Sequence, residues 1–581
     1  MAVFGGGPAG LTVAHELAER GFTVDVYERN DALGGKCRGF ARPDTGIDGR
    51  PDLPYNAGGH FFFGFYQNIG QTLRRIPIGN GRTVLDNLTT GRSKRMRVRL
   101  FSSGDDLAVD IGARSGLREV LTGAFLTNMK SVTRVISQLG LRDVATLASK
   151  IAVLCTAGEE RRFGELEHRT LREVFRADSF TTSGGRRFVE EIASNLTIAN
   201  GQDENARVVA RVFEGAVASV LGRNGYGLKG LLAHLNNPEN EAWIDPWARH
   251  LEQFGVRFHL QQTLKSLTYA NGRIIGATVQ DAGNREYSID ADCYVLATPQ
   301  TEMASLMSDD LVAADPALGR IQRLCQLGGI SVSIFLRHKL PELGTAFVIG
   351  DCNWQNGNEV LTSVWQKDLS QYGDGEAVEV VSAQITDPAF RYQAGQLYGK
   401  AGDACTSTEL VAEMLAMFRQ HIPNGERLFA EEAIHSWVIA GGPEDRNESL
   451  GTFNEYLFGP TRSCWQDQPS QRTAIPNLFL AGTHTRTIVG CDSMDGANES
   501  GKRAANAILE AADSSEIRAD VIEWSPHPLF RLLQRWDDRR YLVGKRNLFD
   551  FVAPMTDDVQ SADPVERWNA RTISSIERHR A

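Results

Sequence analysis

Three glycines near the start of the chain have the spacing of a phosphate-binding turn. They fill a G-x-G-x-x-G pattern directly after a short apolar run. Such glycines let the backbone turn tightly beside a pyrophosphate, and the N-terminus of the helix that follows faces that anion. The residues predicted to surround the phosphates are Gly5, Gly7, Pro8, Ala9 and Gly10.

The residues after this turn complete a strand–helix–strand unit. A helical stretch runs from Leu11 to Arg20, and the alternating run 22–27 then ends at Glu28. An acid at the end of that second strand can bind the two hydroxyls of a ribose. Because every piece stands at the expected spacing, the sequence predicts a bound dinucleotide, with Glu28 and Arg29 among its contacts.

Two further glycine pairs lie within the first 70 residues. Gly34-Gly35-Lys36 follows the Glu28 strand, where its backbone can approach the same pyrophosphate and Lys36 can balance the charge; a surface turn is the alternative. Gly58-Gly59 precedes His60 and a strip of five aromatic residues that ends at Tyr66. That strip could line a flat aromatic cofactor and an apolar substrate. Alternatively, it is a buried strand whose His60 caps a backbone carbonyl.

A fourth element lies near residue 490. The apolar strand Leu478–Ala481 delivers Gly482 and Thr483, and a helix is predicted from about Met494 to Leu509. A helix N-terminus stabilises the negative charge that a reduced flavin ring carries. We therefore expect the strand to reach the ribityl chain of a flavin, and the helix to point at its ring.

These motifs resemble the flavin amine oxidase and carotenoid desaturase superfamily. Residues 58–68 resemble the G-x-H-x-F-F-G-x-Y-x-N signature of plant and cyanobacterial phytoene and zeta-carotene desaturases, and residues 246–299 are also similar. The resemblance implies an FAD cofactor, and a backbone contact from Leu264 to its adenine. The cofactor-binding residues that it adds are Gly58, Gly59, His60, Leu264, Ala297, Thr298, Ser493, Met494 and Ala497.

The chain departs from the family pattern after its last strand. The family usually has an acid just after that strand's glycine, whereas this chain reads Ala481-Gly482-Thr483-His484. Thr483 or His484 must therefore take the place of the acid. The segment from Thr485 to Ser493 copies neither the amine oxidases nor the desaturases.

Flavin chemistry has no rival in the sequence, because neither a P-loop, a metal-ligand cluster nor a Ser-His-Asp order is apparent. FAD accepts a hydride at N5 from a carbon held over its ring. Candidate acids or bases are His60 and His484, and Arg486 could bind an anion or stabilise reduced flavin. The leading hypothesis is a dehydrogenase or desaturase for a largely apolar, isoprenoid-like small molecule.

Three alternatives stay open. They are an amine or amino-acid oxidase, a non-redox flavin isomerase (a carotenoid cis–trans isomerase or a sugar-nucleotide mutase), and a flavin-containing binding or scaffold protein. No lysine could be assigned to the place that amine oxidases use near N5, and the aromatic strip around His60 favours the desaturase. The sequence leaves open whether oxygen or a quinone accepts the electrons, and which oligomer forms.

Composition limits the class of protein. The net charge of -10 argues against a nucleic-acid partner, which needs a basic face. Eight scattered cysteines without a C-x-x-C pair indicate thiols in a reducing compartment. A strand that begins at residue 2 and the lack of a long apolar run predict neither a signal peptide nor a membrane span. We expect a cytoplasmic protein, with membrane association through its tail as a further hypothesis.

The length of 581 residues exceeds a single core, so several domains are expected. The predicted fold is α/β: a Rossmann-like FAD-binding domain in separate segments, an inserted α+β substrate domain and a helical C-terminal extension. The predicted FAD-binding segments are 1–70, 245–300 and 471–512. The predicted substrate segments are 71–244, largely helical, and 301–470, with a sheet and helices; the extension is 513–581.

The extension carries an amphipathic segment, 524–552. Basic and apolar residues, with Trp536 and Tyr541 among them, alternate there at helical spacing. One interpretation is a foot on a membrane surface, which suits a lipid substrate. The other is a helix packed on the protein body, favoured because Asp537 and Asp538 interrupt the positive face.

Overall fold

The chain forms two compact units in a computed structural model. The first unit comprises 1–131, 219–458 and 468–524, and the second comprises 132–218, 459–467 and 525–581. The structure describes residues 1–89, 95–102, 105–112, 124–182, 185–186, 189, 204–228, 230–349, 352–354, 356–386, 393–440 and 457–555.

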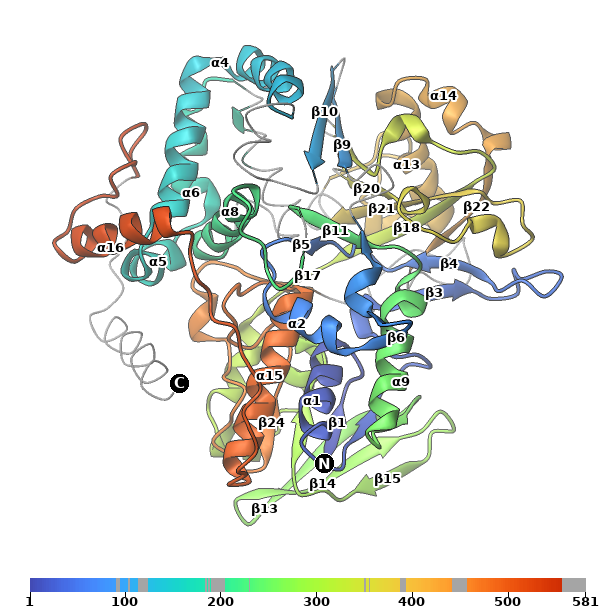
Figure 1. Ribbon diagram of the computed structural model, residues 1–581, viewed down its shortest axis with the longest axis vertical. Helices are drawn as coiled ribbons and strands as arrows, with labels where there is room; N and C mark the ends of the chain where they lie inside the picture. The colour runs from blue at the N-terminus through green and yellow to red at the C-terminus, as the bar shows by residue number, and fades with distance from the viewer. Residues whose placement is uncertain are drawn as a thin grey trace. The chain divides into compact units, whose positions relative to one another are not determined.

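A five-stranded parallel sheet lies at the centre of the cofactor half of the first unit (Figure 1). Its order is β12–β2–β1–β16–β24, and every neighbouring pair is parallel. The strands in that order are Arg257–His259, Asp25–Tyr27, Ala2–Phe4, Tyr294–Leu296 and Leu478–Leu480. Strands β1, β16 and β24, one from each of the three separate segments, are apolar and buried, as parallel strands covered on both faces require. The predicted Rossmann-like α/β fold is thereby confirmed.

Two helices from opposite ends of the chain lie side by side on this sheet (Figure 1). They are α1 (Pro8–Ala18) and α15 (Met494–Ala511). A side chain at Gly501 would place its Cβ 2.6 Å from the carbonyl oxygen of Ala9, so the two helices meet at a residue without one. The further helices of this unit are α2 (Asn68–Arg75), α9 (Asp245–Gln253), α10 (Gln300–Ser305), α11 (Asp309–Ala314), α13 (Ser407–His421) and α14 (Gly425–Leu428).

A second, seven-stranded sheet forms the other half of the first unit. Its order is β10–β9–β19–β20–β21–β18–β22, antiparallel throughout except between β9 and β19. The strands in that order are Asp105–Gly112, Arg95–Ser102, Ala346–Ile349, Asn356–Val360, Glu379–Thr386, Gly329–Leu336 and Ile434–Ile439. The apolar stripe of α13, with Leu410, Met414 and Phe418, is buried in the same core as Ile334 and Phe347.

One strand ends earlier than its sequence predicts. The run 359–365 reads as a strand, but β20 ends at Val360 and a short 3-10 helix, Leu361–Ser363, follows. Leu361, Val364 and Trp365 instead fill a separate apolar core beside the sheet. The apolar character of this run therefore reflects burial in irregular structure.

The described residues form five smaller sheets besides these two. Their strands lie in the first unit, except that Gly459, the last residue of β23, belongs to the second. Two of them carry residues of interest: β5–β11–β8 holds the aromatic strip, and β13–β14–β15 holds Leu264. The strands are β3 (Gly39–Arg42), β4 (Leu53–Asn56), β5 (Phe62–Phe63), β6 (Pro77–Gly79), β7 (Arg82–Thr83), β8 (Leu88–Thr89), β11 (Leu232–Leu235), β13 (Thr263–Ala270), β14 (Arg273–Gln280), β15 (Glu286–Ile289), β17 (Cys325–Leu327) and β23 (Leu457–Gly459).

The second unit is helical where the structure describes it. Its core includes Leu154, Phe175 and Val209, in keeping with the helical periodicity of the sequence there. Its helices are α4 (Ala124–Thr156, from Val132 on), α5 (Glu159–Gly164), α6 (Leu171–Phe175), α8 (Ala206–Val220) and α16 (Pro528–Leu542). Helix α4 breaks at Gly140, where φ is 73°.

The structure describes all eight cysteines, and none of them forms a disulfide. Among the described helices, none is both long and apolar enough to cross a membrane.

Candidate active site

The glycine turn between β1 and α1 forms a tight cradle. Gly5 has a φ of 111°, and a Cβ there would lie 2.5 Å from the carbonyl oxygen of Ala297. A Cβ at Gly10 would collide with the carbonyl oxygen of Gly5. Side chains are thus excluded at both positions because backbone meets backbone.

The first turn of α1 offers its N–H groups to a ligand. Gly7 is the N-cap residue, Pro8 follows it, and no side chain from the described residues caps this helix end. Uncapped N–H groups and the helix dipole together bind anions. Beside the turn, the buried hydroxyl of Thr298 has no hydrogen-bond partner among the described residues. These orphaned groups fit the phosphates of a dinucleotide.

Glu28 lies at the end of β2 and is 4% exposed. One carboxylate oxygen accepts the Gly6 N–H at 2.7 Å, and the other accepts the backbone and side-chain N–H groups of Asn30 at 2.9 and 2.7 Å. These bonds fix the carboxylate, and Oε2, which accepts a single N–H, keeps a site for a further donor. The geometry fits a residue that receives a ribose hydroxyl.

Two predicted contacts lie around Glu28. Gln262 donates its backbone N–H to the Glu28 carbonyl at 2.8 Å, and this brings Leu264, in β13, close to the acid. The Arg29 guanidinium forms an ion pair with Glu302 of α10 and is only about one-third exposed. Arg29 is thus engaged with a protein carboxylate.

The Gly34-Gly35-Lys36 turn lies directly against the cradle. Gly34 donates its N–H to the Gly6 carbonyl at 2.9 Å, and its φ is 115°. A Cβ on Gly35 would lie 2.9 Å from the Cα of Gly7. The second glycine pair therefore closes over the first, as a turn that shares one pyrophosphate must.

Asp492 joins three segments of the site, and sequence reasoning missed it. Its carboxylate accepts from Lys36 Nζ at 2.7 Å, from Thr483 Oγ1 at 2.9 Å and from the Phe458 N–H at 3.0 Å. Burial raises the pKa of Asp492, but the Lys36 charge and these hydrogen bonds outweigh burial and lower it. The acid that the family pattern places after this strand is therefore replaced by Asp492, whose carboxylate lies beside Thr483 although it is nine positions downstream. Its place two residues before the predicted helix start at Met494 was the available signal.

The start of α15 is tied to the start of α2. Ser493 caps α15 by accepting the Gly496 N–H at 3.1 Å. Asp495 accepts the N–H groups of Ile69 and Gln67, at 2.8 and 3.2 Å, and so caps α2. The predicted contacts Met494 and Ala497 are buried in the same turn.

His60 is held at both ring nitrogens. Its Nε2 lies 3.1 Å from the Lys36 carbonyl oxygen, and its Nδ1 lies 3.3 Å from Glu239 Oε1. Burial lowers the pKa of His60, yet the hydrogen bond and charge of Glu239 outweigh burial and raise it. These contacts are those of a residue that fixes the Lys36 turn, and the carbonyl cap considered from the sequence is present.

His484 and Arg486 contact other segments than His60 does. His484 is 2% exposed, and its Nε2 lies 3.2 Å from Met303 Sδ of α10. Burial lowers the pKa of His484 to about 4, so the imidazole is neutral at pH 7. Arg486 is half-buried and donates its backbone N–H to the Pro469 carbonyl at 3.0 Å.

Gly59, just before the predicted aromatic strip, lies against an acid and an amide of the seven-stranded sheet. A Cβ at Gly59 would collide with Glu359 Oε1 of β20 and lie 2.8 Å from Gln384 Oε1 of β21. At Gly58, by contrast, a Cβ would have open space around it. Phe61 meets His234 of β11 edge-on at 4.8 Å between ring centres. Polar side chains are thus gathered where the sequence predicts the flavin and substrate to meet.

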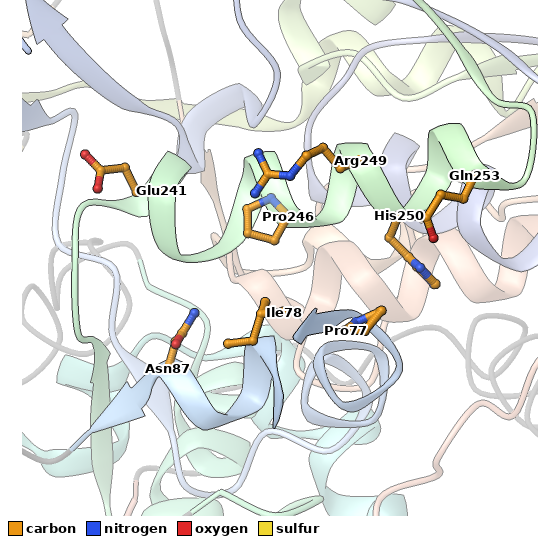
Figure 2. A pocket seen from close by; sticks show the side chains of 8 residues that line it. All are labelled: Pro77, Ile78, Asn87, Glu241, Pro246, Arg249, His250 and Gln253. Atoms are coloured by element: carbon orange, nitrogen blue, oxygen red, sulfur yellow. The ribbon is translucent and has the colours of Figure 1, made fainter. Parts of the chain in front are cut away.

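A cavity of about 410 Å³ lies elsewhere in the first unit, along α9 and β6 (Figure 2). None of its lining residues belongs to the predicted site. They are Pro77, Ile78, Asn87, Glu241, Pro246, Arg249, His250 and Gln253.

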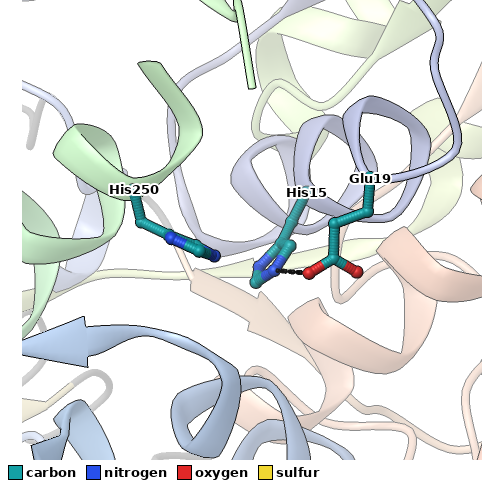
Figure 3. Close-up of side chains that lie close together, drawn as sticks. All are labelled: His15, Glu19 and His250. Carbon is teal, nitrogen blue, oxygen red and sulfur yellow. Dashed lines mark hydrogen bonds and ion pairs between the residues drawn. The ribbon is translucent and has the colours of Figure 1, made fainter. Parts of the chain in front are cut away.

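His15, Glu19 and His250 lie close enough together to suggest a metal site (Figure 3). However, Trp247 Nε1 donates to His15 Nδ1 at 3.0 Å, and His15 Nε2 bonds Glu19 at 2.9 Å. Nδ1 must therefore accept, which leaves the imidazole proton on Nε2. A protonated Nε2 cannot bind a metal, so we assign the cluster a structural role.

Comparison with known proteins agrees with this geometry. The family model described as flavin containing amine oxidoreductase matches residues 8–509. The carotenoid phi-ring synthase of Streptomyces griseus is 43% identical over 88% of this chain and 87% of its own. The zeta-carotene desaturase of Synechocystis sp. is 24% identical over 90% of this chain and 99% of its own.

Among solved structures, the cyclohexylamine oxidase of Brevibacterium oxydans has the same fold. It has a TM-score of 0.55, with 15% identity over 88% of this chain and 98% of that chain. The resemblance inferred from the motifs is confirmed. The chain belongs to the flavin-containing amine oxidoreductase family and is a flavin-dependent oxidoreductase.

Proposed function

We propose that this chain is an FAD-dependent dehydrogenase that removes hydrogen from a carotenoid, at carbons of a terminal ring. The observation that carries the proposal is the 43% identity, over 88% of the chain, to a relative named for forming a carotenoid ring. The desaturase relatives, at 24% identity or less, support a carotenoid substrate in general. A strip of aromatic side chains beside His60 suits such an apolar molecule.

The residues present fit FAD. The amides of the α1 turn suit the pyrophosphate, Glu28 suits the adenosine ribose, and Thr483 with Asp492 suits the ribityl hydroxyls. The N-terminus of α15 suits the ring, where it favours negative charge. When bound, FAD supplies a hydride acceptor. Denaturing the purified protein and identifying the released flavin by chromatography tests the choice of FAD.

The residues of the chain have positioning tasks in this reaction. Lys36 and Asp492 hold the two glycine segments and the Thr483 strand together, and His60 fixes the Lys36 carbonyl. Fixed geometry matters because hydride transfer requires the donor carbon within about 3–3.5 Å of its acceptor.

Anaerobic mixing of the flavin-loaded protein with candidate substrates tests the proposal. We expect a carotenoid with terminal rings to bleach the flavin and to lose hydrogen in pairs, seen as a mass decrease of the product. Faster bleaching by an acyclic carotenoid would overturn the assignment to a ring. Bleaching by amines alone would instead establish an amine oxidase, and a product of unchanged mass would establish an isomerase.

A membrane surface is the proposed source of the substrate. On α16 of the second unit the exposed face carries Leu529, Leu532 and Trp536, which are 57%, 70% and 46% exposed. Exposed arginines at 531, 535 and 539 lie among them. Apolar side chains flanked by cations favour anionic membranes.

The two acids of α16, which argued against this role in the sequence, turn inward. Asp537 is 3% exposed and accepts from Arg161 Nε at 2.8 Å, and Asp538 accepts the Glu160 N–H at 2.9 Å. The outer face therefore keeps its positive charge.

Vesicle flotation of the full chain tests this part of the proposal. We expect binding to vesicles rich in phosphatidylglycerol and little binding to phosphatidylcholine vesicles. Leu532→Glu should reduce binding at least tenfold, whereas Leu141→Glu, on α4 and 80% exposed, should not. Equal losses in both variants would refute a role for α16.

A further inference from the structure

Glu359 is a buried acid that reaches the backbone of the predicted flavin segment. It lies on β20, is 2% exposed, and its Oε1 occupies the space that a side chain on Gly59 would need. Gln384, on the neighbouring strand, reaches the same glycine. The absence of a side chain at position 59 thus lets a carboxylate approach the segment that precedes His60.

The Glu359 carboxylate is not satisfied by its surroundings. Its Oε2 lies 3.6 Å from His234 Nδ1, beyond an ordinary hydrogen bond. Its Oε1 and the Nε2 of His234 have no hydrogen-bond partner in the part of the chain that the structure describes. Leaving a buried polar atom unpaired is costly, and more so for a charged group. A buried carboxylate with an unpaired oxygen is explained if that oxygen has a partner during the reaction.

Dehydrogenation of a hydrocarbon releases a proton that such a carboxylate can accept. Forming a C=C bond breaks two C–H bonds on adjacent carbons: one hydrogen leaves as a hydride, the other as a proton. The electron pair of the second C–H bond becomes the new π bond. A hydrocarbon has no basic atom of its own, so a protein group must take the proton.

We infer that Glu359 is the proton acceptor of the dehydrogenation. This inference rests on the proposed function. The hydride passes to the bound flavin, which is reduced by two electrons, while the proton from the adjacent carbon passes to Glu359 Oε1. The carboxylate becomes a carboxylic acid, and substrate and flavin together balance in electrons.

The other titratable groups near Gly59 are less suited to this task. His60 is bonded at both ring nitrogens, to Glu239 and to the Lys36 carbonyl. One oxygen of Glu239 already accepts from His60 and from Asn56 Nδ2, the latter at 2.5 Å. This Glu239 oxygen is therefore already engaged by donors of the protein. Glu359 is the acid whose free oxygen touches Gly59.

The test compares Glu359→Gln with Glu379→Gln, both in the flavin-loaded full chain. Glu379 is a matched control: it is also buried in the seven-stranded sheet, at 3% exposed, but binds the Leu340 N–H. We expect Glu359→Gln to keep the flavin spectrum and to bleach about 10²–10⁴-fold more slowly with the ring carotenoid. The acid limb of the bleaching rate against pH should disappear. Glu379→Gln should keep the wild-type rate and pH profile.

Bleaching of Glu359→Gln at the wild-type rate would overturn the inference while leaving the proposed function intact. If no carotenoid bleaches even the wild-type protein, the proposed function fails and the inference with it. If Glu359→Gln does not hold flavin, Glu359→Asp decides the matter. That variant keeps a carboxylate at a shorter reach, so it should bleach more slowly and retain a pH-dependent rate; an unchanged rate would refute proton transfer.

Discussion

The pair formed by Lys36 and Asp492 allows a quantitative test of how the cofactor half is held together. Replacing Lys36 with Met removes the cation while keeping its apolar stem, and replacing Asp492 with Asn keeps the shape of the acid. The double variant completes a thermodynamic cycle. The cycle isolates the interaction between the two side chains from their other contacts.

The structure sets the expected size of this interaction. The two side chains are 25% and 13% exposed and their charged atoms are 2.7 Å apart. A hydrogen bond between charged groups contributes about 1.5–3 kcal/mol, and partial exposure of Lys36 reduces this to about 1–2 kcal/mol. Asp492→Ala should cost more, about 3–5 kcal/mol, because the bonds from Thr483 and Phe458 are lost as well.

Urea unfolding of the flavin-free proteins, followed by tryptophan fluorescence, measures the coupling. Because the folded carboxyl pKa is lowered, the coupling should be present at pH 7 and should disappear as the pH falls through that lowered pKa. Asp492→Asn should also weaken FAD binding, measured by titration of the apoprotein. A coupling energy within about 0.5 kcal/mol of zero would refute the role assigned to this pair.

Three further changes have defined outcomes. Burial raises the pKa of Glu499 from 4.5 to about 7, so wild-type stability should fall between those pH values as the pH rises; Glu499→Gln should flatten the pH dependence of the urea midpoint. Gly501→Val should destabilise the protein by about 1–3 kcal/mol and weaken FAD binding in calorimetry, because the new side chain forces α15 away from α1. The control Gly283→Ala, in an exposed turn, should change neither stability nor FAD binding. Trp247→Phe should lower the free energy of unfolding by about 1 kcal/mol and free His15 Nδ1 for a proton. His15 Nε2 could then bind a metal, so Zn²⁺ should raise the melting temperature of the variant but not of the wild type. An equal response of both proteins would contradict the assigned tautomer.

The glycine cradle could be predicted because its geometry is local. Gly5, Gly10 and Glu28 lie within one strand–helix–strand unit, and each of these residue types is required by a contact inside or beside that unit. Two of the parallel strands could be predicted in the same way, from the short apolar runs that end at Gly5 and Gly482. Here the sequence pattern and the structure express the same steric constraints.

The contacts that complete the site could not be predicted, because they join distant segments. Lys36 and Asp492 are 456 positions apart, and no local pattern marks Asp492 as the partner of Thr483. Glu359 lies in a strand whose predicted bounds ran through irregular structure as far as residue 365. The bonding of α16 is a related case: helical spacing alone does not show that Asp537 and Asp538 both bond α5 and leave the outer face to arginines.

The strand order of the parallel sheet also bears on how the chain is made. Strand β1 pairs with β2 early in synthesis, but its other neighbour, β16, begins at Tyr294, and β24 follows only at Leu478. A chain still on the ribosome must therefore carry one open edge of its central strand until Leu296 has emerged, and an open edge of β16 until Leu480 has emerged. Contacts of such long sequence separation form slowly, and exposed edges aggregate. We expect this cofactor half to assemble only after β24 has been made, so that helper proteins and early flavin supply govern the yield of folded enzyme.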